Sequence, residues 1–149
     1  MSDIESTSKV EILLVEDNPG DIVLFTEALE ESHSRSNLNT VEDGEEAINF
    51  LHQRGHFKYA PRPQLIILDL NLPRLNGREV LQEIRSQSNF DNIPIVVLTT
   101  SKSDRDMAEA YRLHANCYIV KPVDLKQFMN VLKEIIHFWL NVAHLPSEE

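Results

Sequence analysis

The sequence predicts an α/β fold in which helices cover both faces of a five-stranded parallel sheet. Two observations predict it. Short aliphatic runs, of the length typical of buried parallel strands, recur along the chain. Amphipathic segments with apolar residues at helical spacing separate these runs. Strict alternation of strand and helix favours right-handed crossovers, which place helices on both faces of a single sheet.

Each predicted strand is followed by a predicted helix. The strands are expected near residues 11–16, 39–41, 65–69, 95–98 and 117–120, and the helices are expected to begin near residues 19, 45, 77, 103 and 124. Asn18 and Pro19 are typical of a helix start, because asparagine caps the first turn and proline suits the first helical position. Residues 54–63 are expected to form a connection longer than is usual in this architecture.

Length and charge limit the function. With 149 residues, we expect one domain over residues 1–149, with a core at about 10–140. Only 28 residues follow Lys121, so no output domain is expected. The net charge of −10 argues against nonspecific nucleic-acid binding, and the four glycines are not spaced as a P-loop or a glycine-rich dinucleotide-binding motif requires. No apolar run is long enough to cross a membrane and no export signal begins the chain, so a cytoplasmic protein is expected.

Polar residues follow four of the predicted strands. They are Glu16 and Asp17, then Asp69, Thr99 and Lys121. The carboxyl ends of parallel strands meet at one edge of the sheet, so these side chains should converge. Two carboxylates about 5 Å apart repel by roughly 3 kcal/mol at an effective dielectric near 20, which a cation such as Mg²⁺ would relieve. The sequence therefore predicts a site for a divalent cation and a phosphoryl group, with Asp69 as the candidate nucleophile.

The order and spacing of these motifs resemble the receiver domains of two-component response regulators. The resemblance covers residues 10–140 and is carried by residues 14–18, 65–77, 94–99 and 118–122. It implies a flavodoxin-like receiver fold with strand order 2-1-3-4-5. It also implies that Asp69 accepts a phosphoryl group from a sensor histidine kinase, with slow self-dephosphorylation rather than enzymatic turnover.

The same resemblance implies roles for the other site residues. Mg²⁺ or Mn²⁺ would be held by Glu16, Asp17, Asp69 and the backbone carbonyl of Asn71, with Asp17 and Asp69 as direct ligands. Thr99 and Lys121 would contact the phosphoryl group, Tyr118 would be the switch aromatic, and Asn71 and Ser101 would tune dephosphorylation. The peptide bond between Lys121 and Pro122 is often cis in such domains.

A narrower resemblance points to single-domain regulators that partner bacterial phytochromes, especially cyanobacterial ones. Residues 18–21, 62–63, 99–101, 113–118 and 138–140 carry it. The last helix also has apolar side chains beyond a single stripe, which predicts that it extends past the domain and contacts a partner. We expect a homodimer through the fourth helix, fifth strand and fifth helix, with Phe138 and Trp139 as candidate contacts.

Two other classes of protein share part of this pattern. A phosphatase of the haloacid dehalogenase type also places an aspartate after a strand, but it needs an acid two residues later, where Asn71 stands. A flavodoxin-like cofactor binder needs a hydroxyl- and glycine-rich loop after the first strand. Here residues 16–19 are acidic and would repel a phosphate without a cation.

Overall fold

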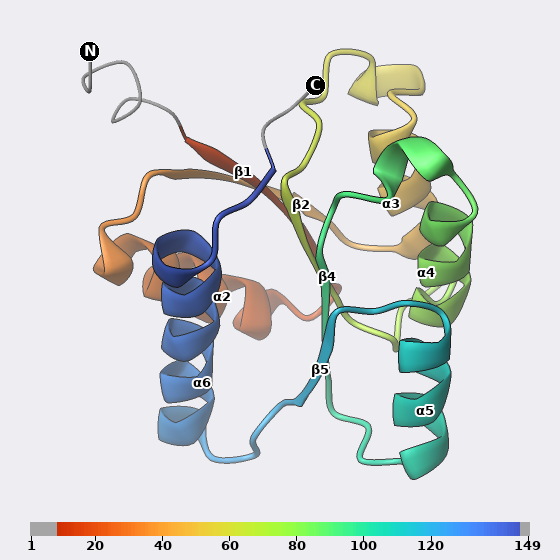
Figure 1. The fold of residues 1–149 in the computed structure, drawn as a ribbon. Helices are drawn as coiled ribbons and strands as arrows, with labels where there is room; N and C mark the ends of the chain where they lie inside the picture. Colours follow the sequence, from red (N-terminus) through yellow and green to blue (C-terminus); the bar gives the residue numbers. More distant parts are fainter. Residues whose placement is uncertain (1–8, 147–149) are drawn as a thin grey trace.

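The computed structural model describes residues 9–146, which form one parallel sheet between two layers of helices (Figure 1). The strands are β1 Val10–Val15, β2 Ser36–Val41, β3 Leu65–Leu68, β4 Ile95–Thr99 and β5 Cys117–Val120. Their order is β2-β1-β3-β4-β5, and every neighbouring pair is parallel. The predicted fold class and strand order are confirmed.

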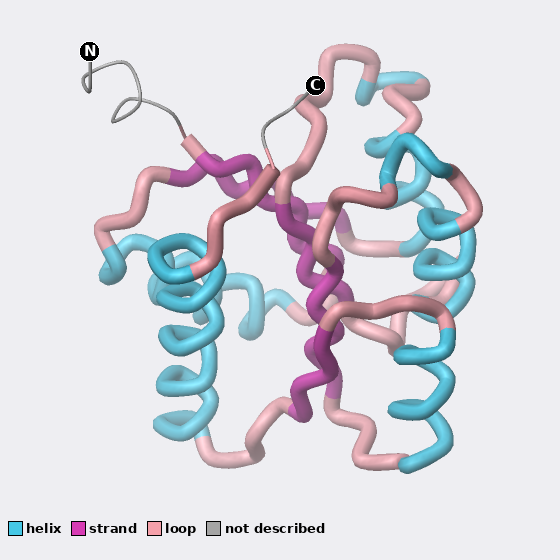
Figure 2. The backbone as a smooth tube through the Cα atoms, in the orientation of Figure 1, coloured by secondary structure: helices cyan, strands magenta, loops and turns pink. Residues whose placement is uncertain are grey.

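The helices divide between the two faces of the sheet. They are α2 Pro19–Ser32, α3 Gly44–Leu51, α4 Gly77–Arg85, α5 Asp104–Arg112 and α6 Leu125–His137. Short helical turns add Gly55–Phe57, Ser88–Phe90 and Phe138–Val142, the last continuing α6. Figures 1 and 2 show α2 and α6 together on one face and α3, α4 and α5 on the other.

The strands supply side chains to both layers. Along β1, Leu13 and Val15 pack with the α3–α4–α5 layer, whereas Ile12 and Leu14 pack with α2 and α6. All four are buried, as expected for a strand covered on both faces. These two cores pack against the central strands from both faces and so determine where the residues that follow the strands lie.

Side-chain caps begin the helices near the expected places. Asn18 Oδ1 accepts a hydrogen bond from the Asp21 amide, which confirms the start predicted for α2. Asn76 and Glu79 form a reciprocal capping box at the start of α4. Both caps satisfy amides that the first helical turn leaves without partners, and both lie close to the strand ends that carry the polar residues.

Two local expectations need correction. Strand β2 begins at Ser36 rather than near residue 39, because the polar residues Ser36 and Asn37 also pair with β1. No peptide bond within residues 9–146 is cis, so the bond between Lys121 and Pro122 is trans and the cis expectation is wrong.

The C-terminal segment returns to the domain after α6. Leu145 packs against the core shared by α2 and α6, and Gln64 Nε2 donates a hydrogen bond to the Pro146 carbonyl at 3.3 Å. The helical segment continues to Val142, but Trp139 and Leu140 near its end pack against the core shared by α2 and α6, and the chain after it folds back on the domain. Of the helices within residues 9–146, none combines the length and apolar character needed to cross a bilayer.

Candidate metal and phosphoryl site

The ends of β1 and β3 bring the three predicted carboxylates together. Val15 lies opposite Leu68 in the sheet, so Glu16 and Asp69 leave neighbouring strands at the same level. The Asp69 amide donates to the Val15 carbonyl at 3.1 Å, which fixes the backbone of the two strand ends. Ligand oxygens of Glu16, Asp17 and Asp69 all lie within 4.8 Å of one another. The predicted convergence of these residues is therefore present.

Burial makes this cluster electrostatically unfavourable without a cation. Glu16 and Asp69 are 2% and 6% exposed, whereas Asp17 is exposed. Burial, together with the Asp69 charge, raises the pKa of Glu16 to about 7, although a hydrogen bond from Lys121 opposes the shift. Oxygen donors from three carboxylates in this spacing fit a hard divalent ion such as Mg²⁺ or Mn²⁺.

Lys121 joins the cluster from the end of β5 and is 6% exposed. Its Nζ donates to Glu16 Oε1 at 2.8 Å, to Asp21 Oδ2 at 2.8 Å and to Asp69 Oδ2 at 3.1 Å. Burial alone would lower the pKa of this ammonium, but the hydrogen bonds to Asp21 and Glu16 raise it above its usual value. Lys121 therefore stays charged and neutralises part of the acidic cluster.

Asp21 is the residue that the sequence analysis missed. It lies in the first turn of α2, four residues after Asp17. Side chains in a helix point back toward its N-terminus, so a residue of this first turn can reach the strand end from which the helix starts. The place of Asp21 in this first turn could therefore have been predicted from the sequence. Its contact with Lys121 could not, because the two residues are 100 positions apart.

Thr99 and Asn71 lie on the β4 side of Asp69, whereas Glu16 lies on its β1 side. Thr99 is fully buried at the end of β4, and its Oγ1 lies 3.4 Å from both Asn71 Nδ2 and the Ser101 amide. The Asn71 amide donates to Asp69 Oδ1 at 3.1 Å. Both oxygens of Asp69 are thus held by fixed donors, one from the backbone and one from Lys121.

Tyr118 is linked to the same region through the loop after β4. Its hydroxyl donates to the Ser101 carbonyl at 3.0 Å, while Ser101 Oγ donates to Asp106 Oδ2 at 2.6 Å. Arg78 of α4 completes the group, since its guanidinium contacts Asp106 at 3.2 Å. The loop that carries Ser101 is therefore connected to β5, α4 and α5.

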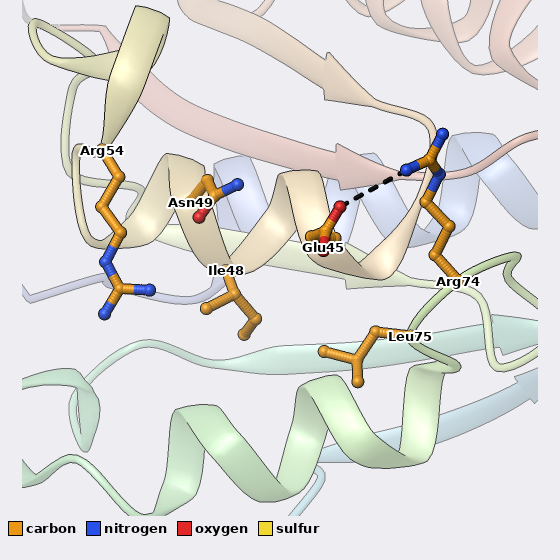
Figure 3. Close-up of a pocket in the computed structure, with 6 residues that line it drawn as sticks. All are labelled: Glu45, Ile48, Asn49, Arg54, Arg74 and Leu75. Atoms are coloured by element: carbon orange, nitrogen blue, oxygen red, sulfur yellow. Dashed lines mark hydrogen bonds and ion pairs between the residues drawn. The ribbon is translucent and has the colours of Figure 1, made fainter.

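A separate pocket of about 390 Å³ lies between α3 and the loop after β3 (Figure 3). It is lined by Glu45, Ile48, Asn49, Arg54, Arg74 and Leu75. The Arg74 guanidinium is paired with Glu45 at 3.5 Å, as the dashed line shows, and with Asp43. None of the strand-end residues lines this pocket, so it is separate from the acidic cluster.

The fold and this cluster define a class of protein. Residues 12–133 match the family model of the response regulator receiver domain, so the chain belongs to that family. The alternatives of a haloacid dehalogenase phosphatase and a flavodoxin-like cofactor binder are therefore set aside.

Individual relatives agree with this membership. Response regulator Rcp1 of Synechocystis sp. is 45% identical over 147 residues, which cover 99% of both chains. The crystal structure of the Mn²⁺-bound form of Rcp1 has a TM-score of 0.91 at 44% identity, and covers 93% of this chain and 99% of its own. The phosphorylated cyanobacterial phytochrome response regulator RcpA also has a TM-score of 0.91, at 48% identity over 94% of this chain and 100% of its own.

Proposed function

We propose that this receiver domain accepts a phosphoryl group on Asp69 from a sensor histidine kinase. The observation that carries the proposal is the joint contact of Lys121 with Glu16 and Asp69, beside a third carboxylate on Asp17. This arrangement pairs a place for a divalent cation with a fixed positive charge, and phosphoryl transfer depends mainly on such positioning and charge stabilisation.

In the proposed reaction, an Asp69 oxygen attacks the phosphorus of the kinase's phosphohistidine. The P–N bond breaks, its electron pair stays on the imidazole nitrogen, and an acyl phosphate forms on Asp69. Mg²⁺ or Mn²⁺, held by Glu16, Asp17, Asp69 and the Asn71 carbonyl, would neutralise charge on the phosphoryl oxygens. Lys121 and Thr99 would contact those oxygens from the two sides of Asp69.

The kinase that we propose is a phytochrome-type photoreceptor. The support is the 48% identity to a protein described as a cyanobacterial phytochrome response regulator, together with the alignment to Rcp1 along nearly the whole chain. The protein would act in the cytoplasm as a single-domain regulator whose output is a protein contact. Tyr118 would transmit the phosphorylation of Asp69 to that contact, with Asn71 and Ser101 setting how long the phosphoryl group lasts.

We also propose that the protein forms a homodimer through α5, β5 and α6. Strand β5 is an edge strand, and a largely apolar groove of about 700 Å³ lies between it and α6. Cys117, Ile119, Phe138 and Trp139 are among the residues that line the groove. Apolar surface of this kind at a sheet edge is typical of an interface.

Phosphorylation of Asp69 is tested with radiolabelled acetyl phosphate and Mg²⁺, followed by detection of acid-stable and base-labile label on the protein. The wild type should become labelled, and Asp69→Asn should not, because the amide is a poor nucleophile. Asp104→Asn is a matched control, since it changes an exposed aspartate at the start of α5. Equal labelling of Asp69→Asn and the control would contradict the assignment.

A further inference from the structure

The ammonium group of Lys121 has no free hydrogen-bond donor. A lysine ammonium carries three N–H groups, and the three acceptors within 3.1 Å of Nζ are carboxylate oxygens of Glu16, Asp21 and Asp69. A phosphoryl group on Asp69 can gain a hydrogen bond from Lys121 only if one of these bonds is given up. The affinity of the site for an anion therefore depends on which of the three hydrogen bonds of Lys121 is broken.

We propose that Asp21 is a positioning residue that restrains Lys121 and opposes the arrival of the phosphoryl group on Asp69. This inference rests on the proposed function and adds a residue to it. Glu16 is needed for the cation site, and Asp69 is the acceptor itself. Asp21 is the remaining partner of Lys121, and it lies outside the group of carboxylates spaced to hold the metal ion.

The position of Asp21 allows its carboxylate to restrain Lys121. Its amide is bound by the Asn18 side chain at 3.1 Å, so the backbone of this first turn of α2 is fixed. Its carboxylate is about one-fifth exposed, at the rim of the site, whereas Lys121 is buried. A carboxylate at the rim can turn toward water when Lys121 leaves it, which a fully buried partner could not do.

The negative charge of Asp21 also opposes the binding of an anion at Asp69. Glu16, Asp21 and Asp69 place three carboxylates around one ammonium, and the Asp17 carboxylate lies beside those of Glu16 and Asp69. A divalent cation is attracted by the Asp21 charge, whereas the oxygens of a phosphoryl group are repelled by it. Removing this one charge should therefore weaken cation binding and strengthen anion binding, and these opposite signs are the signature of the proposed role.

The test compares the wild type with Asp21→Asn, which keeps the size of the side chain and its ability to accept a hydrogen bond. Mg²⁺ affinity is measured by calorimetry, and beryllofluoride affinity is measured separately at saturating Mg²⁺. We expect Mg²⁺ to bind about three- to tenfold more weakly and beryllofluoride to bind tighter by a similar factor, from one charge at short range in a partly exposed site.

Glu27→Gln is the matched control, because it removes one negative charge from an exposed position further along α2. Glu27→Gln should leave the affinities for Mg²⁺ and for beryllofluoride within about twofold of the wild type, since solvent and salt screen an exposed charge that does not contact the site. If Asp21→Asn weakens both ligands, Asp21 only supports the structure, and if it changes neither, Asp21 does not restrain Lys121. Either result overturns the inference.

A variant of the acceptor separates this inference from the proposed function. Asp69→Asn should abolish beryllofluoride binding, because the anion bonds to a carboxylate oxygen of Asp69. If Asp69→Asn binds beryllofluoride as the wild type does, the proposed function itself fails. If Asp69→Asn loses binding while Asp21→Asn shows no gain, the proposed function stands and only the role of Asp21 is wrong.

Discussion

At the scale of single residues, Lys121 holds the acidic site together. Its ammonium contacts three carboxylates that come from the end of β1, from the first turn of α2 and from the end of β3. Buried like charges are costly unless a cation compensates them, and Lys121 is the cation that the chain itself supplies.

Replacing Lys121 by methionine should therefore destabilise the metal-free protein by about 2–4 kcal/mol, because it leaves buried carboxylates without their partner. Saturating Mg²⁺ should restore more stability in this variant than in the wild type, since the ion takes over the compensation. Urea unfolding with EDTA and with Mg²⁺ measures both effects. An equal gain from Mg²⁺ in the two proteins would show that Lys121 and the ion act at independent places.

The raised pKa of Glu16 predicts how stability depends on pH. Burial raises this pKa from 4.5 to about 7, so between these values the folded protein holds a proton that the unfolded chain has lost. The free energy of unfolding of the metal-free protein should then fall as pH rises from 4.5 to 7, by up to about 3 kcal/mol.

Glu16→Gln cannot ionise, and it should lose this part of the pH dependence. Urea unfolding of the wild type and Glu16→Gln at pH 5 and pH 7, in EDTA, gives the comparison. Between pH 5 and pH 7 the free energy of unfolding should fall more in the wild type than in Glu16→Gln. A gap that is the same at both pH values would mean that Glu16 titrates normally.

At the scale of elements, the start of α4 is packed directly against the residue that carries the candidate nucleophile. The Gly77 amide donates to the Leu70 carbonyl at 2.9 Å, and a Cβ atom at Gly77 would overlap the Asp69 carbonyl oxygen and the Leu70 backbone. The backbone of Asp69 and Leu70 can hold this position only because residue 77 has no side chain.

Gly77→Ala should therefore destabilise the protein by about 1–3 kcal/mol, because the backbone must shift to admit the methyl group. The shift moves Asp69, so labelling by acetyl phosphate should also slow. Gly20→Ala is the control: an added Cβ at this position in α2 meets only the Asn18 side chain, at 3.3 Å, and should be nearly neutral. Thermal unfolding that affects the two variants equally would contradict this explanation.

At the scale of the whole molecule, the site and the proposed interface share strand β5. Tyr118 and Lys121 belong to this strand and its end, while Cys117 and Ile119 line the apolar groove beside α6. Phe138 lies at the groove and is 49% exposed. A partner seated there would contact the same strand whose end carries Lys121.

Phe138→Glu should weaken the proposed homodimer, because a charge at an apolar interface has no partner and must lose its hydration. Sedimentation equilibrium should show a dissociation constant raised at least about tenfold, equivalent to a loss of about 1.4 kcal/mol. The free energy of unfolding of the monomer should change little, since the side chain is already half exposed. Val23→Glu, at an exposed position of α2, is the control. An association that is unaffected by Phe138→Glu would place the interface elsewhere.

The sequence alone determined the sheet and most of the site. Buried parallel strands appear as aliphatic runs, and their ends lie at one edge whatever the details of packing, so Glu16, Asp17, Asp69, Thr99 and Lys121 could be assigned to one place from local pattern. The start of β2 was missed because its residues are polar and become a strand only by pairing with β1.

Only the tertiary structure decided which charges meet. The contact between Asp21 and Lys121 joins residues 100 positions apart. Arg85 of α4 likewise donates to the His114 carbonyl and to Asn116 Oδ1, which are 29 and 31 positions away. A local pattern specifies where a strand ends and which face of a helix is apolar. The distance between two side chains depends on how all the layers pack together, and that distance determines their hydrogen bonds and pKa values.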